Sequence, residues 1–480
     1  MESHDQNLGH GALAAGLSEA GRLLQGFYDG LDDRRVAPGT PLEDVIHAFA
    51  STLGEGGVGV DGALRDVERC VLPHAMSIPH PLYLGLINSS PLPGGIVAES
   101  IVSGLNNNAG SWEQSPPLSA AEEEVKRCFI ELLGLDPASS GIVLPGGSYT
   151  TLHAMQLARE AKLPGWSANG ARSLAGDPRV YVSDASHFSA ARAAIAVGVS
   201  PKDVVPVPTR GRGAIDPQAL RLALEGDRAA GRLPFALVAT LGTTGTGAMD
   251  PLPELIEIAR EFDLWLHVDA CYGGAAALLG ELRPRFEGLA EADSVSVDPH
   301  KWFFVPIAAG LLFTRHPSVE LAAFDVDASY IPRGQRTDPF LRGLPTSRRG
   351  AGFTIWMAIR AHGLSAIRGE VRRNISLARQ LEEALGARGF RVMDGGELSI
   401  VCARWEPVDR TDAECEALQK ELAQATVRSG KAWFGTVRAQ GQSWLRFTLV
   451  STFTRPRHVE AFADHLLGLA EKLPATRPVP

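Results

Sequence analysis

The sequence lacks an apolar stretch long enough to cross a membrane. Its longest apolar run, residues 303–313, is interrupted by Pro306 and Gly310, whereas a membrane-spanning helix needs about 20 consecutive apolar residues. We therefore interpret this run as a buried strand and its approach. Residues 1–10 are polar and contain no apolar segment of the signal-peptide kind, so we expect a cytoplasmic protein with no membrane partner.

Cysteine is also scarce, and the chain has no excess of positive charge, with 46 lysines and arginines against 55 acidic residues. The five cysteines are odd in number, scattered along the chain, and form no Cys-x-x-Cys pair. The sequence therefore predicts neither a disulfide framework nor a zinc or other metal site, and buried free thiols are expected. The net charge of −9 argues against a nucleic-acid partner, because phosphate binding favours a basic face.

Length and composition indicate two or three domains. The chain has 480 residues, of which 45% are hydrophobic and 21% are charged. We predict an N-terminal helical arm at 1–80, in which a helical pattern at 42–53 precedes the glycine-rich stretch 54–62. Such an arm lacks a core of its own and should pack on the rest of the chain or on a second subunit. A large domain is placed at 81–355 and a small C-terminal α+β domain at 356–480.

The large domain shows the pattern of an α/β fold. Between residues 141 and 313 short apolar runs alternate with helical patterns, which is typical of a parallel sheet covered by helices. Asp250 and Pro251 are expected to cap and open the helix that follows one of these strands. Ligands of open parallel sheets bind beyond the carboxyl ends of the strands, so side chains that follow the strands should converge on one crevice. The expected strands are 141–144, 180–182, 235–241, 264–268 and 294–297.

The small domain has a different texture. A helix is expected at 371–385 and ends at Gly386. Residues 432–439 and 442–450 flank the pair Gln440-Gly441, which predicts a hairpin. A final helix at 458–473 closes the chain.

Two strand ends carry the residues that pyridoxal 5'-phosphate (PLP) chemistry needs. Strand 264–268 delivers Asp269, and strand 294–297 delivers His300 and Lys301. A lysine amine can hold PLP as an imine, and a carboxylate in an apolar setting can keep the pyridine nitrogen protonated, which makes the ring an electron sink. Taken separately, the motifs have plainer interpretations, namely a surface His-Lys pair and a helix cap or loop salt bridge. Their order and neighbours favour the cofactor.

A phosphate site is predicted between strand 141–144 and the helix after it. The backbone of Gly147, the helix N-terminus and the Ser148 hydroxyl would offer hydrogen-bond donors, although a plain strand-to-helix turn has the same pattern. A dinucleotide fold is disfavoured because the full Gly-x-Gly-x-x-Gly spacing is missing. His187 follows strand 180–182 and could stack on a PLP ring, but a lone histidine is more often structural. Thr244 lies at another strand exit, which in isolation indicates only a turn.

Taken together, the motifs resemble the PLP-dependent group II amino-acid decarboxylases, a family that includes the aromatic-amino-acid and glutamate decarboxylases. The resemblance spans roughly residues 80–363 in the same order, and the lysine motif is its most specific part. It is carried by His80-Pro81, Asn106-Asn107-Asn108, Ser115-Pro116 with 122–125, Gly146-Gly147-Ser148, Ser186-His187, 240–244, His267-Val268-Asp269-Ala270 and Asp298-Pro299-His300-Lys301-Trp302.

The resemblance implies a fold-type-I protein with a mostly parallel seven-stranded sheet. It also implies a homodimer whose active sites lie at the subunit interface. Lys301 would form the internal aldimine, Asp269 would pair with the ring nitrogen, and His187 would stack on the ring. The residues that would hold or border the phosphate are Gly147, Ser148, Thr244 and His300.

Some positions depart from the family pattern or await a role. Tyr149-Thr150-Thr151 stand where the family often has an acidic residue and then asparagine, and Cys271 stands where a small residue is usual. Residues 325–349 have the composition of a mobile loop, in which Tyr330 falls where the family has its catalytic-loop tyrosine. By this resemblance Tyr330 would protonate a carbanion under a closed lid, whereas the plainer interpretation is an exposed loop tyrosine. The arginines of this region could steer a carboxylate or be solvated loop charges.

The predicted reaction is the decarboxylation of an L-amino acid to its amine and CO2. Tyr330 and His187 together favour it, because family members with phenylalanine in the loop tend toward aldehyde-forming oxidative chemistry. An oxidative deaminase, a carbon-carbon lyase and a PLP-binding paralogue without turnover remain alternatives. The resemblance also implies a substrate pocket that includes His80, Leu86 and Ile87, and the aliphatic pair at 86 and 87 favours an apolar or aromatic substrate over an acidic one.

Overall fold

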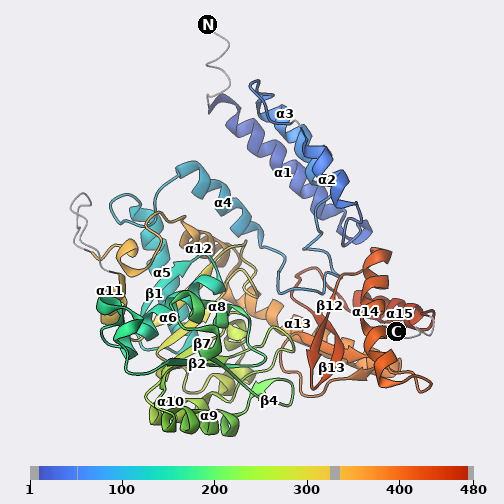
Figure 1. Ribbon diagram of the computed structural model, residues 1–480. Helices are drawn as coiled ribbons and strands as arrows, with labels where there is room; N and C mark the ends of the chain where they lie inside the picture. Colours follow the sequence, from blue (N-terminus) through green and yellow to red (C-terminus); the bar gives the residue numbers. More distant parts are fainter. Residues whose placement is uncertain (1–9, 51, 325–335, 474–480) are drawn as a thin grey trace.

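A computed structural model describes residues 10–50, 52–324 and 336–473 (Figure 1). Its centre is a seven-stranded sheet with the strand order β1-β9-β8-β7-β6-β2-β3. The strands are β1 (Ser140–Leu144), β2 (Pro178–Ser183), β3 (Val204–Val207), β6 (Leu233–Thr240), β7 (Trp265–Asp269), β8 (Ser294–Val297) and β9 (Gly310–Thr314).

Six of these strands run in one direction, and β9 runs against them. β9 pairs antiparallel with both β1 and β8, while the remaining pairs in the sheet are parallel. Thr240, Asp269 and Ser296 lie side by side across β6, β7 and β8. The carboxyl ends of these strands therefore meet at one edge, and the predicted mostly parallel sheet of fold type I is confirmed.

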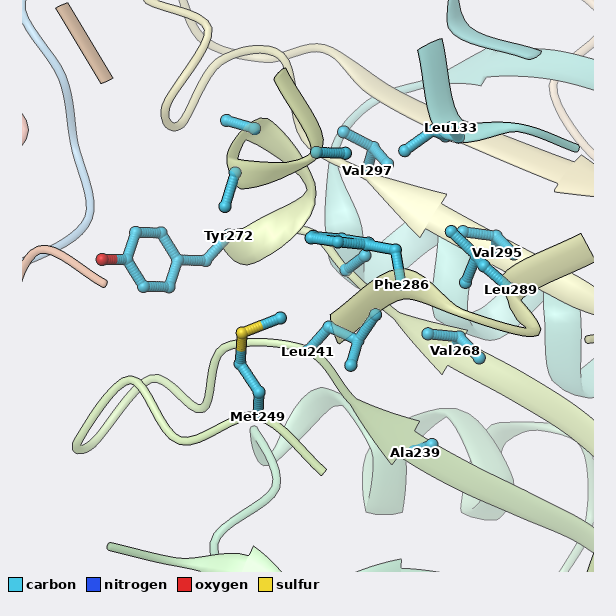
Figure 2. Close-up of a cluster of buried hydrophobic side chains, with 14 of the residues drawn as sticks. Leu133, Ala239, Leu241, Met249, Val268, Tyr272, Phe286, Leu289, Val295 and Val297 are labelled. Atoms are coloured by element: carbon cyan, nitrogen blue, oxygen red, sulfur yellow. The ribbon is translucent and has the colours of Figure 1, made fainter. Parts of the chain in front are cut away.

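Both faces of the sheet are buried under helices. Side chains alternate between the two faces along each strand, so each strand contributes to both layers of the core. In β6, Leu237 and Ala239 join one hydrophobic cluster and Ala236 and Val238 join the other. The first cluster packs against α5 (Pro116–Leu133), α9 (Pro217–Ala229), α10 (Leu252–Glu261) and α12 (Ala351–His362), and the second against α6 (Gly147–Lys162) and α8 (Ser189–Ala196). Figure 2 shows Leu241, Val268, Val295 and Val297 of the first cluster with Leu133 and Phe286.

One prediction about this region is wrong. Asp250 does not cap α10, which begins at Leu252 with Pro251 as its N-cap. The Asp250 carboxylate instead accepts the backbone N–H groups of Ile215 at 2.8 Å and Thr240 at 2.7 Å. The carboxylate therefore ties the end of β6 to the short strand β5 (Ala214–Ile215). Burial raises the pKa of Asp250 to about 6.

The C-terminal part forms a second, antiparallel sheet with the order β10-β11-β13-β12. Gln440 and Gly441 both have positive φ, at 52° and 75°, as a two-residue hairpin turn requires, so the predicted hairpin is confirmed. The strands are β10 (Arg391–Val392), β11 (Ile400–Arg404), β12 (Gly435–Ala439) and β13 (Gln442–Thr448), and the helices are α13 (Leu364–Ala387), α14 (Asp412–Ser429) and α15 (Pro456–Ala470).

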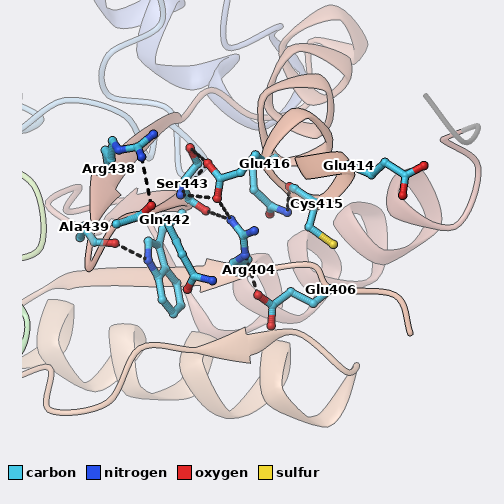
Figure 3. Close-up of polar contacts among 12 residues, drawn as sticks. Arg404, Glu406, Glu414, Cys415, Glu416, Arg438, Ala439, Gln442 and Ser443 are labelled. Carbon is cyan, nitrogen blue, oxygen red and sulfur yellow. Dashed lines mark hydrogen bonds and ion pairs between the residues drawn. The ribbon is translucent and has the colours of Figure 1, made fainter. Parts of the chain in front are cut away.

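A buried arginine ties this sheet to α14 (Figure 3). Arg404 donates to Glu406 at 2.6 Å, to Glu416 at 2.7 Å and to the Ser443 carbonyl at 2.6 Å. Because a buried guanidinium must be paired to be tolerated, these contacts fix β11 against β13 and α14.

The N-terminal arm consists of α1 (Leu13–Asp29), α2 (Leu42–Phe49) and α3 (Gly59–Asp66). Its helices extend away from the large sheet (Figure 1), and the arm touches the small domain where the Val36 N–H donates to the Gly430 carbonyl at 2.8 Å. The arm is helical as expected, while the exact domain boundaries stay a prediction. No helix in the described ranges combines the length and apolarity that a membrane crossing requires.

Candidate active site

A cavity of about 380 Å³ lies at the carboxyl ends of the large sheet. This volume is within the range of about 300–1,000 Å³ that is usual for small-molecule sites. Side chains and backbone from the loops after β1, β2, β6, β7 and β8 line it, as expected for the crevice of an open α/β sheet. The cavity brings together seven predicted residues, namely Gly147, Ser148, His187, Thr244, Asp269, His300 and Lys301.

Lys301 reaches this cavity from the turn that follows β8. Its Nζ lies 2.9 Å from Oδ2 of Asp298, which is almost completely buried. Burial lowers the pKa of Lys301, but the negative charges of Asp298 and Asp269 outweigh it, so that the net shift is upward. Without a ligand the lysine is therefore held as an ammonium by an ion pair.

Asp269 stands at the end of β7, on another wall of the same cavity. The Cys271 N–H donates to its Oδ1 at 3.0 Å. Burial raises the pKa of Asp269, but the charge of Lys301 and the Cys271 amide lower it further, so the net shift is downward. The group is thus a carboxylate at neutral pH and can accept a hydrogen bond from a protonated ring nitrogen.

His187 lies in the loop between β2 and α8. The Ser189 N–H donates to its Nδ1 at 3.3 Å, and the Ser189 hydroxyl lies 2.7 Å from the same nitrogen. Burial, followed by the charge of Lys301, lowers the pKa of His187. The imidazole is therefore neutral at physiological pH, and these contacts favour the tautomer with its proton on Nε2.

The turn between β1 and α6 forms the predicted phosphate cradle. Gly146 has a φ of 96°, which favours glycine, and a Cβ there would also lie at the tight distance of 3.2 Å from Cε1 of His300. The first amides of a helix have no partner inside it; in α6 the Tyr149 and Thr150 N–H groups donate to the Gly146 carbonyl, which leaves those of Gly147 and Ser148 for an anion. Thr150 and Thr151, which depart from the family pattern, donate back to the Gly147 carbonyl at 2.9 Å and 2.8 Å and so stabilise the turn.

The Thr244 turn is fixed from the small domain. Arg446 of β13 donates through Nε to the Thr244 carbonyl at 2.8 Å and through Nη1 to the Gly85 carbonyl. Tyr272, which lines the cavity, stacks on Trp302 with ring centroids 5.1 Å apart. The cavity wall at Thr244 is therefore held by segments around Gly85, Thr244 and Arg446 that are distant in sequence.

The predicted substrate residues do not line this cavity. His80 is buried in a separate hollow between the arm and the small domain, where its Nδ1 accepts the Leu82 N–H at 2.9 Å and burial lowers the pKa of His80 to about 4. Leu86 is 53% exposed, and Ile87 belongs to the hydrophobic core. Within one chain none of the three therefore lines the cavity that contains Lys301. Tyr330 lies outside the described residues.

The described arginines of the 325–349 region contact other protein groups. Arg342 pairs with Glu320 at 2.8 Å, and the buried Arg348 pairs with Glu122 at 2.7 Å. Arg349 bonds to Glu99, and the Arg336 guanidinium lies 4.9 Å from the Trp112 ring centroid. Arg348 therefore belongs to a buried ion pair, and neither a carboxylate-steering role nor a solvated loop charge describes it. Arg333 lies outside the described residues.

The sequence did not assign several residues of the cavity wall to the site, among them Thr240, Cys271 and Asp298. Cys271 was noted only as a departure, yet its Sγ would lie 2.8 Å from a Cβ at Gly147. Asp298 belongs to the lysine motif, but no role followed from its place in the sequence. Its position directly after a predicted strand was the available signal.

The donor set fits PLP. The cavity offers a lysine amine, a carboxylate and a glycine-rich helix start, which are the groups that an aldehyde, a pyridine nitrogen and a phosphate require. In addition, Thr240 Oγ1 and Asp298 Oδ1 are buried without a hydrogen-bond partner among the described residues. Buried polar atoms are seldom left unpaired, so these two mark a polar site. The fold and the site define a PLP enzyme of fold type I.

Comparison with known proteins gives the family. The profile described as "Pyridoxal-dependent decarboxylase conserved domain" matches residues 60–406, and the chain belongs to this family of PLP-dependent decarboxylases. An aromatic-L-amino-acid decarboxylase from Bacillus atrophaeus is 27% identical over 463 residues, which cover 95% of each chain. A 4-hydroxyphenylacetaldehyde synthase from Rhodiola rosea is 27% identical over 445 residues, or 90% of each chain.

Solved structures with the same fold were also found. The crystal structure of Oryza sativa TDC with PLP and tryptamine matches with a TM-score of 0.92 at 23% identity, covering 97% of this chain and 99% of that one. The recognised family, the fold class and the cofactor predicted from the sequence are confirmed.

Proposed function

We propose that this enzyme decarboxylates an aromatic or apolar L-amino acid to the corresponding amine and CO2. The observation that carries the proposal is the charge arrangement of the cavity, in which Lys301 and Asp269 face one volume and Asp269 keeps its carboxylate ionised. The aromatic-L-amino-acid decarboxylase from Bacillus atrophaeus supports the reaction and the substrate class.

The predicted residues of the cavity each have a role in this proposal. Lys301 would hold the cofactor covalently, and the first amides of α6 with Gly147, Ser148, Thr244 and His300 would hold or border its phosphate. With its ring nitrogen paired to Asp269, PLP would supply an electron sink for the pair of electrons that the departing CO2 leaves behind. The neutral His187 would stack on the ring.

Tyr330 is proposed to deliver the proton to Cα after CO2 has left. Its assignment rests on the family resemblance alone. Protonation at Cα separates the decarboxylase from the aldehyde-forming chemistry, whose example among the relatives is the Rhodiola rosea synthase. The position of a single proton donor therefore decides between the two outcomes.

The rim of the cavity favours an apolar substrate side chain. Ile307, which is 70% exposed, and the exposed Tyr149 both line the cavity. Single exposed aliphatic side chains are common on protein surfaces, but these two stand where a substrate would enter the cavity. An apolar substrate side chain would cover Ile307 and gain hydrophobic free energy in doing so.

A homodimer with shared active sites is part of the proposal. The arm exposes Leu17 and Ile46, and α4 (Pro93–Leu105) exposes the stripe of Val97, Ile101 and Leu105 at a spacing of four residues. Such a stripe on a helix fits a partner surface. A second subunit would also explain how Leu86 could reach an active site other than that of its own chain. The buried free cysteines are consistent with a cytoplasmic enzyme.

The test is a panel of L-amino acids offered to the PLP-loaded enzyme, with CO2, amine, ammonia and peroxide measured in each reaction. We expect CO2 and amine in equal amounts, with aromatic or large apolar substrates used best and glutamate poorly. Lys301→Ala protein serves as the blank. Aldehyde, ammonia and peroxide without amine would replace the proposal by the oxidative alternative, and turnover of glutamate alone would overturn the substrate class.

A further inference from the structure

Asp298 lies between the lysine and the phosphate cradle. Its side chain is only 1% exposed, and its Oδ2 is 2.9 Å from Lys301 Nζ. A Cβ at Gly147 would lie 2.6 Å from Oδ2, and a Cβ at Gly310 would lie 2.8 Å from Oδ1. The carboxylate is therefore packed against the backbone of the cradle on one side and of β9 on the other.

Lys301 compensates the charge of this buried carboxylate. The titratable groups that line the cavity with Asp298 are His300 and Lys301 on its own turn, Asp269 at the end of β7, Cys271 and Tyr272 after it, His187 after β2 and Tyr149 on α6. Among the described residues that line the cavity, Lys301 is the one lysine or arginine. Asp298 Oδ1 has no hydrogen-bond partner in the described part of the chain. A buried carboxylate that loses its cation is strongly destabilised. The free-energy cost of burying Asp298 therefore depends on the charge and the hydrogen-bond donors of Lys301.

We propose that Asp298 opposes cofactor binding and thereby keeps the cofactor exchangeable. When the lysine ammonium condenses with an aldehyde, one C=N bond forms, one water leaves, and a protonated imine replaces the ammonium. The nitrogen then keeps its single positive charge but carries one N–H in place of three, so Asp298 retains a counter-charge and loses hydrogen-bond donors. The phosphate would add a second, like-charge effect, because the cradle that would hold it begins at Gly147, against which Asp298 is packed. The ion pair thus stabilises the cofactor-free chain more than the loaded one.

This inference requires the cofactor but not the proposed substrate. It would hold equally if the amino-acid panel gave another product. Its readout is cofactor affinity, which is measured without turnover.

The experiment compares Asp298→Asn with the unaltered enzyme, both freed of cofactor. Asparagine keeps the shape of the side chain and removes its charge. Absorbance titration with PLP should give a dissociation constant lower by about tenfold or more, because a nearby like charge has been removed, and PLP should be lost more slowly on dialysis. Pyridoxal, which has the aldehyde but no phosphate, and inorganic phosphate, measured by competition with PLP, should each bind more tightly, so the two effects are measured separately.

Asp293→Asn is the matched control. Asp293 is also buried and paired with a cation, Arg315, at 2.8 Å, but it precedes β8 and lies away from the cavity. Its PLP affinity should be unchanged. Asp298→Ser provides a second neutral variant if the asparagine variant does not fold, as judged by circular dichroism. A folded neutral variant that binds PLP as the unaltered enzyme does, or more weakly, would overturn the inference.

Discussion

Asp269→Asn separates the charge of the β7 carboxylate from its shape. An asparagine oxygen can still accept the Cys271 N–H, which now reaches Asp269 Oδ1 at 3.0 Å, so the free energy of unfolding should change by no more than about 1 kcal/mol. Lys301 is untouched, and the variant should still bind PLP and show its visible absorbance. What is lost is the ionised partner of the ring nitrogen.

The expected effect is on the rate. Removing a preorganised electrostatic partner that acts in the transition state costs roughly 3–4 kcal/mol, and each 1.36 kcal/mol corresponds to a factor of about ten. We therefore expect kcat to fall roughly 10²- to 10³-fold with little change in KM, measured as CO2 release under saturating PLP. Asp293→Asn, which removes a carboxylate of the same sheet away from the cavity, should keep its rate. A folded, PLP-loaded Asp269→Asn enzyme with more than a tenth of the normal kcat would refute the role given to this residue.

Three further predictions concern the lysine, a buried acid and the proposed dimer. Lys301→Ala should lose both the visible absorbance and turnover, and retention of either would contradict the covalent link. Because burial raises the pKa of Asp250 from 3.8 to about 6, its favourable contribution is complete below about pH 4 and is lost as pH rises through 6. Relative to Asp250→Asn, the unaltered enzyme should lose roughly 3 kcal/mol of unfolding free energy between pH 4 and 7. An unchanged difference in unfolding free energy between the two proteins at pH 4 and pH 7, measured by denaturant unfolding, would exclude this. Ile101→Asp, at a 39% exposed position, should give monomers in light scattering, whereas the control Leu222→Asp on α9 should not.

The sequence predicted the parts of the site that depend on strand order. A residue that directly follows a parallel strand is carried to the carboxyl edge wherever the strand lies in the sheet, so Asp269, His300 and Lys301 could be placed together without knowing side-chain packing. The hairpin around Gln440-Gly441 was predictable for a similar reason, because two residues with positive φ fix the turn locally.

Contacts between distant segments were beyond the sequence. Asp250 resembles a helix cap, but its carboxylate accepts amides from Ile215 and Thr240, and no local pattern distinguishes these partners. Asp298 was overlooked because its importance comes from the close approach of Gly147 and Gly310. His80 was expected at the substrate, yet within one chain it lies between the arm and the small domain, and only the assembled oligomer can test its predicted role.

Arg446 has a consequence for the order of events during synthesis. It joins the Gly85 and Thr244 carbonyls, so the wall beside the cofactor is incomplete until β13 has been synthesised and has folded onto the large domain. A nascent chain that already contains Lys301 and Asp269 would still lack this brace. Vitamin B6 capture should therefore wait for the small domain rather than follow directly on the synthesis of Lys301.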